Sequence, residues 1–225
     1  ILTTNKKVTR ILQGSIGPEA LTLREHIPDE QLVGPLFSHF YAINETIKFR
    51  SIVAMGELGL RLASKRMEKA RVLMRRIMWN LNDESGGIGW GSPEAMGEIL
   101  SKSPELAAEF KSILFSYLDP RGNFIEHEAL QRGVLWGIGT YLKAMTQDLD
   151  KTTEALIGLH LLSSDPVKRG YAVRALTNAG SFMGRILPES LRTDPEEIDI
   201  FTGWHFIKIC IADIADACAP KKIIS

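Results

Sequence analysis

Residues 79–98, WNLNDESGGIGWGSPEAMGE, contain the two patterns on which the fold prediction rests. The tetrad that ends this stretch, Ala-Met-Gly-Glu at 95–98, also occurs at 54–57. Self-similarity with a period near 40 residues is typical of proteins built from stacked helix pairs. The glycine-rich and acidic residues before the second tetrad interrupt an otherwise helical pattern. The stretch therefore predicts a helical repeat that carries an enlarged loop in its second unit.

The recurrence extends along most of the chain. Gly56, Gly97 and Gly139 follow one another at intervals of 41 and 42 residues, and Thr177 occupies a matching context 38 residues later. A small residue precedes each of these positions by two: Ala54, Ala95, Gly137 and Ala175. Small residues at the same place in successive helices let neighbouring helices approach closely. The pattern predicts that these second helices of the units stack on one another.

Another apolar-periodic stretch precedes each second helix and predicts a first helix. These stretches cover residues 31–41, 65–79, 105–118 and 149–162. Between the two helices of each unit lies a polar turn with an Asx residue: Asn44, Asn82, Asp119 and Asp165. Asx side chains accept hydrogen bonds from backbone N–H groups and cap the helix that follows. Each unit therefore reads as a helix, a turn and a second helix.

Helix pairs of this length and order resemble the HEAT-like (armadillo-type) repeat family, whose antiparallel pairs stack into a curved solenoid. The resemblance implies an all-α fold, a right-handed superhelical solenoid of about four HEAT-like helix pairs over residues 29–181. Residues 1–28 are expected to form an irregular lead-in with a short helix. Residues 182–225 are expected to form a helical cap, because Asp194 and Pro195 offer an N-cap and a first-turn proline before an apolar run.

Composition restricts the classes of function. The chain has 225 residues, 44% of them hydrophobic, with 27 basic and 27 acidic side chains. Zero net charge, and a middle segment 80–128 with 3 basic against 9 acidic residues, argue against nucleic-acid binding, which requires neutralised phosphates. No apolar run reaches the ~18 residues that a bilayer demands. Cys210 and Cys218 lack metal-ligand neighbours and read as reduced thiols. We therefore expect a cytoplasmic protein that contacts no membrane.

The enlarged loop is the strongest candidate site. Ser92 and Pro93 suit the N-cap and first position of a helix, so the preceding residues form a loop that is costly to order. A shorter turn would serve a purely structural role, so the loop is either a recognition element or a structural plug between repeats. We define the loop patch as its aromatic and polar side chains with an arginine border: Trp79, Asn82, Asp83, Glu84, Trp90, Glu94, Arg71, Arg75 and Arg76.

Metal binding is the alternative use of these carboxylates. Glu94 and Glu98 share one helix face, and the candidate ligands are Asp83, Glu94, Glu98 and His127. Their spacing fits neither an EF-hand nor a His-Glu-x-x-His pair. Deoxyhypusine hydroxylases resemble the chain in their helical repeats, but that family needs four His-Glu pairs and only His127-Glu128 matches here. The sequence accordingly predicts no metal and no cofactor.

The leading functional hypothesis is a binding or scaffold protein that presents a curved helical surface to a protein or peptide partner. We expect no catalytic residue, because the histidines are scattered and none is spaced with a nucleophile. The first alternative is a metal-binding or enzymatic HEAT-like protein that uses the loop carboxylates. The second is a DNA-binding HEAT-like protein, for which only the basic stretch 48–76 argues.

Overall fold

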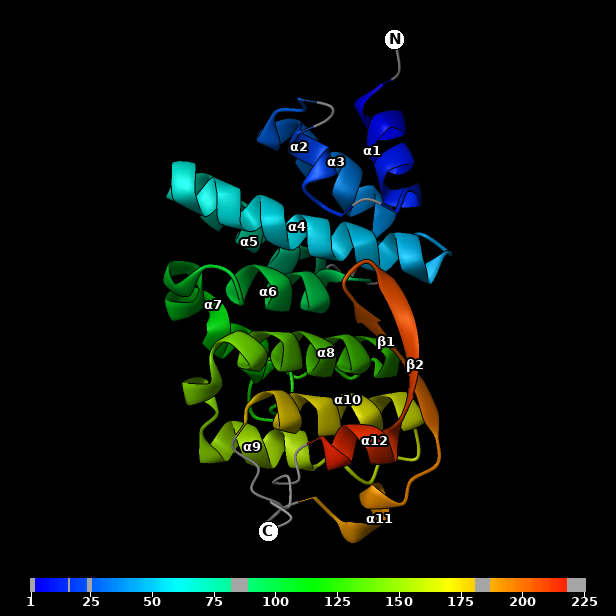
Figure 1. Cartoon of the computed structure of the whole chain (residues 1–225). Coiled ribbons are helices and arrows are strands. Elements are labelled where there is room, and N and C mark those ends of the chain that lie inside the picture. The colour runs from blue at the N-terminus through cyan, green and yellow to red at the C-terminus, as the bar shows by residue number, and fades with distance from the viewer. Residues whose placement is uncertain (1–2, 16, 24–25, 82–88, 181–186, 218–225) are drawn as a thin grey trace, which may run out of the picture.

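The computed structural model describes residues 3–15, 17–23, 26–81, 89–180 and 187–217. Within these residues the chain is mostly helical, with a small β-hairpin near its C-terminal end (Figure 1). Asn82, Asp83 and Glu84 of the loop patch lie outside the described residues. No helix in the described part is long and apolar enough to span a bilayer.

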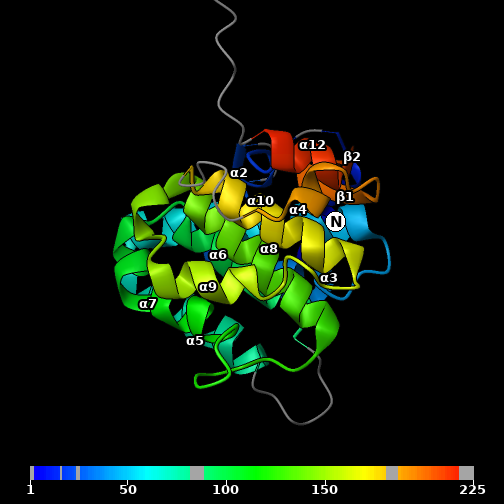
Figure 2. The ribbon, with the colours of Figure 1, turned by 90° about the horizontal axis from the view of Figure 1, so that it is seen from below.

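The predicted helix pairs are present in the predicted order. The first helices are α3 (Asp29–His39), α5 (Met67–Leu81), α7 (Pro104–Ser116) and α9 (Lys151–Gly158). The second helices are α4 (Glu45–Lys65), α6 (Ser92–Leu100), α8 (Glu128–Ala144) and α10 (Pro166–Asn178). Viewed from below, the second helices overlie one another, and α5, α7 and α9 lie together on one side of them (Figure 2).

Helix caps explain where two of the second helices begin. The Asn44 side chain accepts a hydrogen bond from the Ile47 N–H at the start of α4. The Asp165 side chain accepts one from the Val167 N–H at the start of α10, where Pro166 occupies the first turn. Both are positions that the sequence marks as turn caps, and each satisfies a backbone donor that the helix leaves unpaired.

Glycines bring the second helices into contact. A Cβ at Gly97 would lie 2.2 Å from the Gly137 carbonyl oxygen of α8, and one at Gly56 would lie 2.8 Å from Cβ of Glu98. A Cβ at Gly139 would lie 3.0 Å from Cα of Ala175 on α10. The recurrent glycines therefore face the next second helix, as the sequence predicts, and α6 is buried along its whole length.

The C-terminal segment differs from the sequence prediction. Instead of a continuous helix, it forms α11 (Glu189–Arg192), the antiparallel strands β1 (Glu197–Thr202) and β2 (His205–Cys210), and the short helix α12 (Ile211–Asp216). In the sequence Glu-Ile-Asp-Ile of β1, buried and exposed residues alternate, which is the period of a strand. Gly203 supplies the positive φ of 63° that the tight turn requires. The all-α prediction is therefore wrong for residues 197–210.

The Asp194 side chain explains why the expected helix does not start there. It accepts hydrogen bonds from the Glu196 N–H and from the Arg169 guanidinium, the latter at 2.7 Å. These bonds tie the segment to α10 while Glu197 enters the strand. An Asx residue before proline is a cap signal, but it also initiates turns, and here the turn prevails.

The tip of the hairpin is attached to the N-terminal part of the chain, which forms α1 (Thr4–Gln13) and α2 (Ala20–Leu23). Trp204 Nε1 donates to the Gly14 carbonyl at 3.1 Å, and Arg50 of α4 donates to the carbonyls of Trp204, Leu12 and Gly14. The strands extend from this tip past the second helices to α12 (Figure 1). The hairpin is thus fixed at its tip as well as at its base.

Candidate functional site: a cleft beneath the C-terminal hairpin

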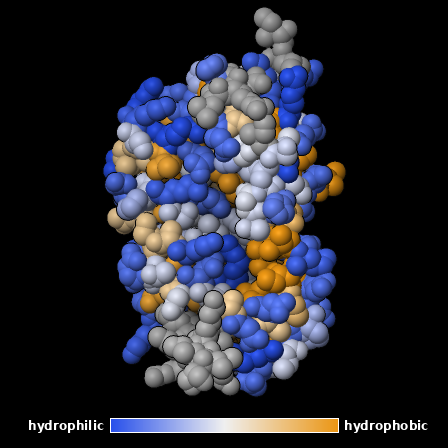
Figure 3. All heavy atoms as spheres, in the orientation of Figure 1, coloured by the Kyte–Doolittle hydropathy of each residue, from blue (hydrophilic) through white to orange (hydrophobic). Residues whose placement is uncertain are grey.

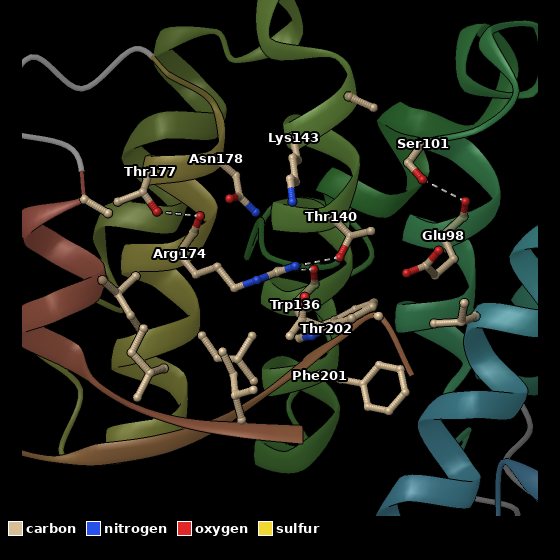
Figure 4. Close-up of a pocket in the computed structure, with 18 of the residues that line it drawn as sticks. Glu98, Ser101, Trp136, Thr140, Lys143, Arg174, Thr177, Asn178, Phe201 and Thr202 are labelled. Carbon is tan, nitrogen blue, oxygen red and sulfur yellow. Dashed lines mark hydrogen bonds between the residues drawn. The ribbon is translucent and has the colours of Figure 1, made fainter. Parts of the chain in front are cut away.

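A cleft of about 760 Å³ lies between the second helices and the C-terminal hairpin. Helices α6, α8 and α10 form one wall, and the hairpin with α12 forms the other (Figure 4). Volumes of 300–1,000 Å³ are usual for ligand pockets. We call this feature the hairpin cleft.

The helix wall is polar and is organised around Arg174 of α10. Its guanidinium donates to the Trp136 carbonyl oxygen and to Thr140 Oγ1 of α8, each at 3.1 Å. One turn along α10, the Asn178 amide donates to the Gly139 carbonyl at 2.9 Å. Lys143 lies on the same face of α8 as Thr140, because residues three apart are neighbours on a helix. Figure 4 shows the Lys143 and Asn178 side chains extending into the cleft beside the end of Arg174.

Positive charge on this wall is not matched by carboxylates. Among the residues that the structure describes, neither Arg174 nor Lys143 has a carboxylate oxygen within 4.0 Å. Burial lowers the pKa of Arg174, and the negative charge of Glu98 opposes that effect. Charged groups removed from water are stable only with compensating partners. The guanidinium therefore forms an anion-attracting centre in the cleft.

The α6 side of the cleft is already neutralised. Lys102 lies 3.1 Å from a Glu57 carboxylate oxygen and 3.5 Å from one of Glu98. Burial raises the pKa of the Glu98 carboxyl, and the Lys102 ammonium acts in the opposite direction. A further carboxylate, Asp213, lines the cleft from α12. Among the described lining residues, the cations without a carboxylate partner therefore lie on α8 and α10.

The hairpin wall is mostly apolar. Its apolar lining residues are Ile200, Phe201, Ile207, Ile209 and, from α12, Ile214 and Ala217, and its polar ones are Thr202 and Asp213. Ile207 on this wall is 39% exposed. In Figure 3 apolar side chains gather over the hairpin next to a polar strip over the neighbouring helices. The cleft therefore presents a mostly apolar wall and a cationic wall to the same occupant.

The arginine border of the loop patch lies elsewhere, on α5 in the first-helix layer. Arg71 donates to a Glu109 carboxylate oxygen at 2.6 Å, and Arg75 pairs with Glu68. Arg71 and Arg75 therefore already have anionic partners among the described residues.

Trp79 and Arg76 border a second, smaller hollow of about 370 Å³ with Phe37 and Tyr41. Trp79 is 77% exposed, and the Arg76 guanidinium stacks 4.5 Å from the centroid of the Phe37 ring. This hollow and the hairpin cleft share no lining residue. The two form separate sites on the molecule.

The two other described members of the loop patch, Trp90 and Glu94, are partly or fully buried. Trp90 is half-buried, and its ring meets the His127 ring edge-on at 5.3 Å. Glu94 is only 7% exposed; burial raises its pKa to about 7, against the effect of Lys48. The metal candidates Glu94, Glu98 and His127 do not meet: no three His, Cys, Asp or Glu residues gather as a metal site in the described part of the chain.

The start of α6 also differs slightly from the expected cap. Gly91 occupies the N-cap position with φ of 73°, and Ser92 is the first helical residue. The Ser92 hydroxyl accepts a hydrogen bond from the Asn80 amide at 2.9 Å, which joins the two ends of the enlarged loop. A left-handed residue at this place favours glycine.

Comparisons with known proteins show similarity to proteins whose descriptions state no function. No protein-family model matches the chain. A protein of Archaeoglobus fulgidus, described as an uncharacterized protein, is 24% identical over 179 residues, covering 80% of this chain and 91% of that protein. The crystal structure of an engineered protein of the Northeast Structural Genomics Consortium is 16% identical, with a TM-score of 0.45, and covers 80% of this chain and 81% of that one.

Sequence reasoning missed the hairpin cleft. Arg174 stands in the sequence Ala-Val-Arg-Ala-Leu of a buried helix, and a lone cation among apolar residues was the available signal. The other half of the cleft comes from strands that the sequence prediction did not contain.

Proposed function

We propose that the chain is a binding protein that takes a peptide segment of a partner protein into the hairpin cleft. The observation that carries this proposal is the pairing of a mostly apolar hairpin wall with a cationic helix wall across one open cleft. Peptides carry apolar and charged side chains at close spacing, so such walls suit them. We further propose that the stacked helix pairs are a short HEAT-like solenoid, a scaffold whose rigid surfaces commonly bind proteins.

Rigidity of the helix wall supports a recognition role. The glycine contacts between α6, α8 and α10 leave little freedom for these helices to shift. Arg174 and Asn178 are held by hydrogen bonds to α8 before any partner arrives. A preformed site loses less conformational entropy on binding than a flexible one.

A peptide selection tests this function. The purified chain is incubated with a library of acetylated octapeptides, and retained peptides are identified by mass spectrometry. Ala144, the exposed last residue of α8, lines the cleft, so Ala144→Trp places an indole inside it. Ala108→Trp, at an exposed position of α7, is the matched control. We expect retained peptides to bind the Ala108→Trp variant normally and the Ala144→Trp variant at least about tenfold more weakly.

The loop patch provides the competing outcome. If the retained peptides bind Ala144→Trp normally but lose affinity for a Trp79→Ala, Arg76→Ala variant, recognition takes place at the loop patch. That result would refute the cleft assignment. If all variants retain the same peptides equally, or if the chain retains no peptide, the proposed function is refuted.

A further inference from the structure

We infer that the occupant of the hairpin cleft presents a carboxylate group to Arg174, flanked by an apolar side chain that packs on the hairpin. This inference deepens the proposed function and rests on it. It assigns the chemical class of the recognised group and its place on the α8–α10 wall.

Arg174 has donors to spare for a ligand. A guanidinium carries five N–H groups in a rigid plane. The described protein acceptors are the Trp136 carbonyl and Thr140 Oγ1, which engage two of them. The Arg174 side chain also stacks over the Trp136 ring, with 5.1 Å between guanidinium carbon and ring centroid, so its plane is fixed. A planar, oriented guanidinium suits a carboxylate, which accepts two parallel hydrogen bonds.

Neighbouring groups favour an anion at the same point. Lys143 adds a second cation that no described carboxylate neutralises. The Thr140 hydroxyl already accepts from Arg174, so its own O–H is directed elsewhere and can donate. Charge-assisted hydrogen bonds of this kind are stronger than neutral ones.

The acidic residues of the cleft restrict where a carboxylate can lie. Glu98 projects from α6 and holds Lys102, whereas Asp213 lines the cleft from α12. Both repel a second anion. The α8–α10 wall is therefore the favoured position, and the hairpin residues Ile200 and Ile207 line the same cleft.

Two libraries distinguish the sources of the carboxylate. One library of acetylated octapeptides has free C-terminal carboxylates, and a second has C-terminal amides. A C-terminal carboxylate as the recognised group predicts binders only in the first library. An Asp or Glu side chain predicts binders in both, with the acidic residue at a fixed position beside an apolar residue. Either result supports the inference.

A thermodynamic cycle then tests Arg174 itself. Dissociation constants are measured for the strongest peptide and for its carboxylate-to-amide analogue, against wild type, Arg174→Gln and Lys143→Gln. We expect the amide to bind wild type at least about tenfold more weakly, because hydrogen bonds to charged groups are strong. Toward Arg174→Gln the two peptides should differ by less than about threefold. Lys143→Gln should lower the affinity for the carboxylate peptide by a smaller factor, and 0.5 M salt should abolish this difference from wild type.

The outcomes separate this inference from the proposed function. Suppose that Ala144→Trp blocks binding of the peptides, but that their carboxylate and amide forms bind wild type with equal affinity. That result would overturn the inference and leave the proposed function standing. If Arg174→Gln lowers the affinity of both peptides by the same factor, the residue only holds α8 against α10. That result would also overturn the inference. The comparison of carboxylate with amide on wild type needs no variant, so it holds even if Arg174→Gln fails to fold. If Ala144→Trp blocks no peptide, both proposals fall.

Discussion

Gly97 of α6 and Gly137 of α8 are in backbone contact: a Cβ at Gly97 would lie 2.2 Å from the Gly137 carbonyl oxygen. Gly97→Ala must therefore push α6 and α8 apart. We expect the free energy of unfolding to fall by about 2 kcal/mol or more, despite the better helix propensity of alanine. Urea denaturation measures the change.

Gly34→Ala is the matched control for that substitution. Gly34 lies inside α3, and a Cβ there meets nothing within 4 Å. We expect it to leave stability unchanged or to raise it by up to about 1 kcal/mol. Equal losses in both variants would contradict the role assigned to the Gly97–Gly137 contact.

Glu94 should make stability depend on pH. Its folded pKa of about 7 lies above the ordinary 4.5, and its Oε2 has no hydrogen-bond partner among the described residues. The folded state therefore holds a proton that the unfolded state releases first. The contribution of Glu94 is fully present below pH 4.5 and is lost as pH rises to about 7.

Glu94→Gln removes this titration. As pH rises from 4.5 to 8, we expect the free energy of unfolding of the variant to increase by roughly 3 kcal/mol relative to that of wild type, because only wild type loses the contribution of Glu94. Chemical denaturation of both proteins across this range measures the difference, and contributions from other groups cancel in it. A difference that stays constant with pH would show that Glu94 ionises normally in the folded chain.

Arg50 should hold the hairpin tip in place. It donates three hydrogen bonds, to the carbonyls of Leu12, Gly14 and Trp204, and stacks over the Trp204 ring at 5.4 Å. Arg50→Gln is expected to cost about 2–3 kcal/mol, because hydrogen bonds to charged groups are lost in a half-buried place. Hydrogen exchange should quicken in β1 and β2 while α7 stays protected. Uniform quickening across the chain would indicate global destabilisation instead.

Arg71 should contribute little to stability. Its guanidinium pairs with Glu109, but the side chains of both residues are 37% exposed. Exposed ion pairs contribute little to stability, because water screens the charges and ordering two long side chains costs entropy. We expect Arg71→Gln to leave the free energy of unfolding nearly unchanged. A larger loss, measured by urea denaturation at 0.15 M salt, would mean that Arg71 has a packing role.

The helical part of the fold could be predicted because its signals are local. Asn44 and Asp165 cap the helices that follow them, and Gly97 and Gly139 recur where second helices touch. Each signal acts within one turn or one repeat. The sequence therefore predicts the order of the helices and the contacts between neighbouring helices.

The hairpin and the cleft could not be predicted in the same way. Asp194 and Pro195 mark a helix start as well as a turn, and the bond that Asp194 accepts from Arg169 on α10 is a long-range contact that the local sequence does not reveal. Period-two alternation from Glu197 to Ile200 was visible, but it extends over only a few residues. Without the hairpin, Arg174 has no opposite wall, and the loop patch is the most conspicuous candidate site in the sequence.

The hydrogen bond from Trp204 to Gly14 joins residues 190 positions apart. Arrays of stacked helix pairs contact only their neighbours, and such arrays can lose their terminal units first. Here β1 contacts α10, β2 contacts α4, and the tip between them binds the segment after α1. Neither end of the stack can fray without releasing the hairpin. The first and last helices should therefore unfold together rather than one end at a time, because the hairpin connects the two ends.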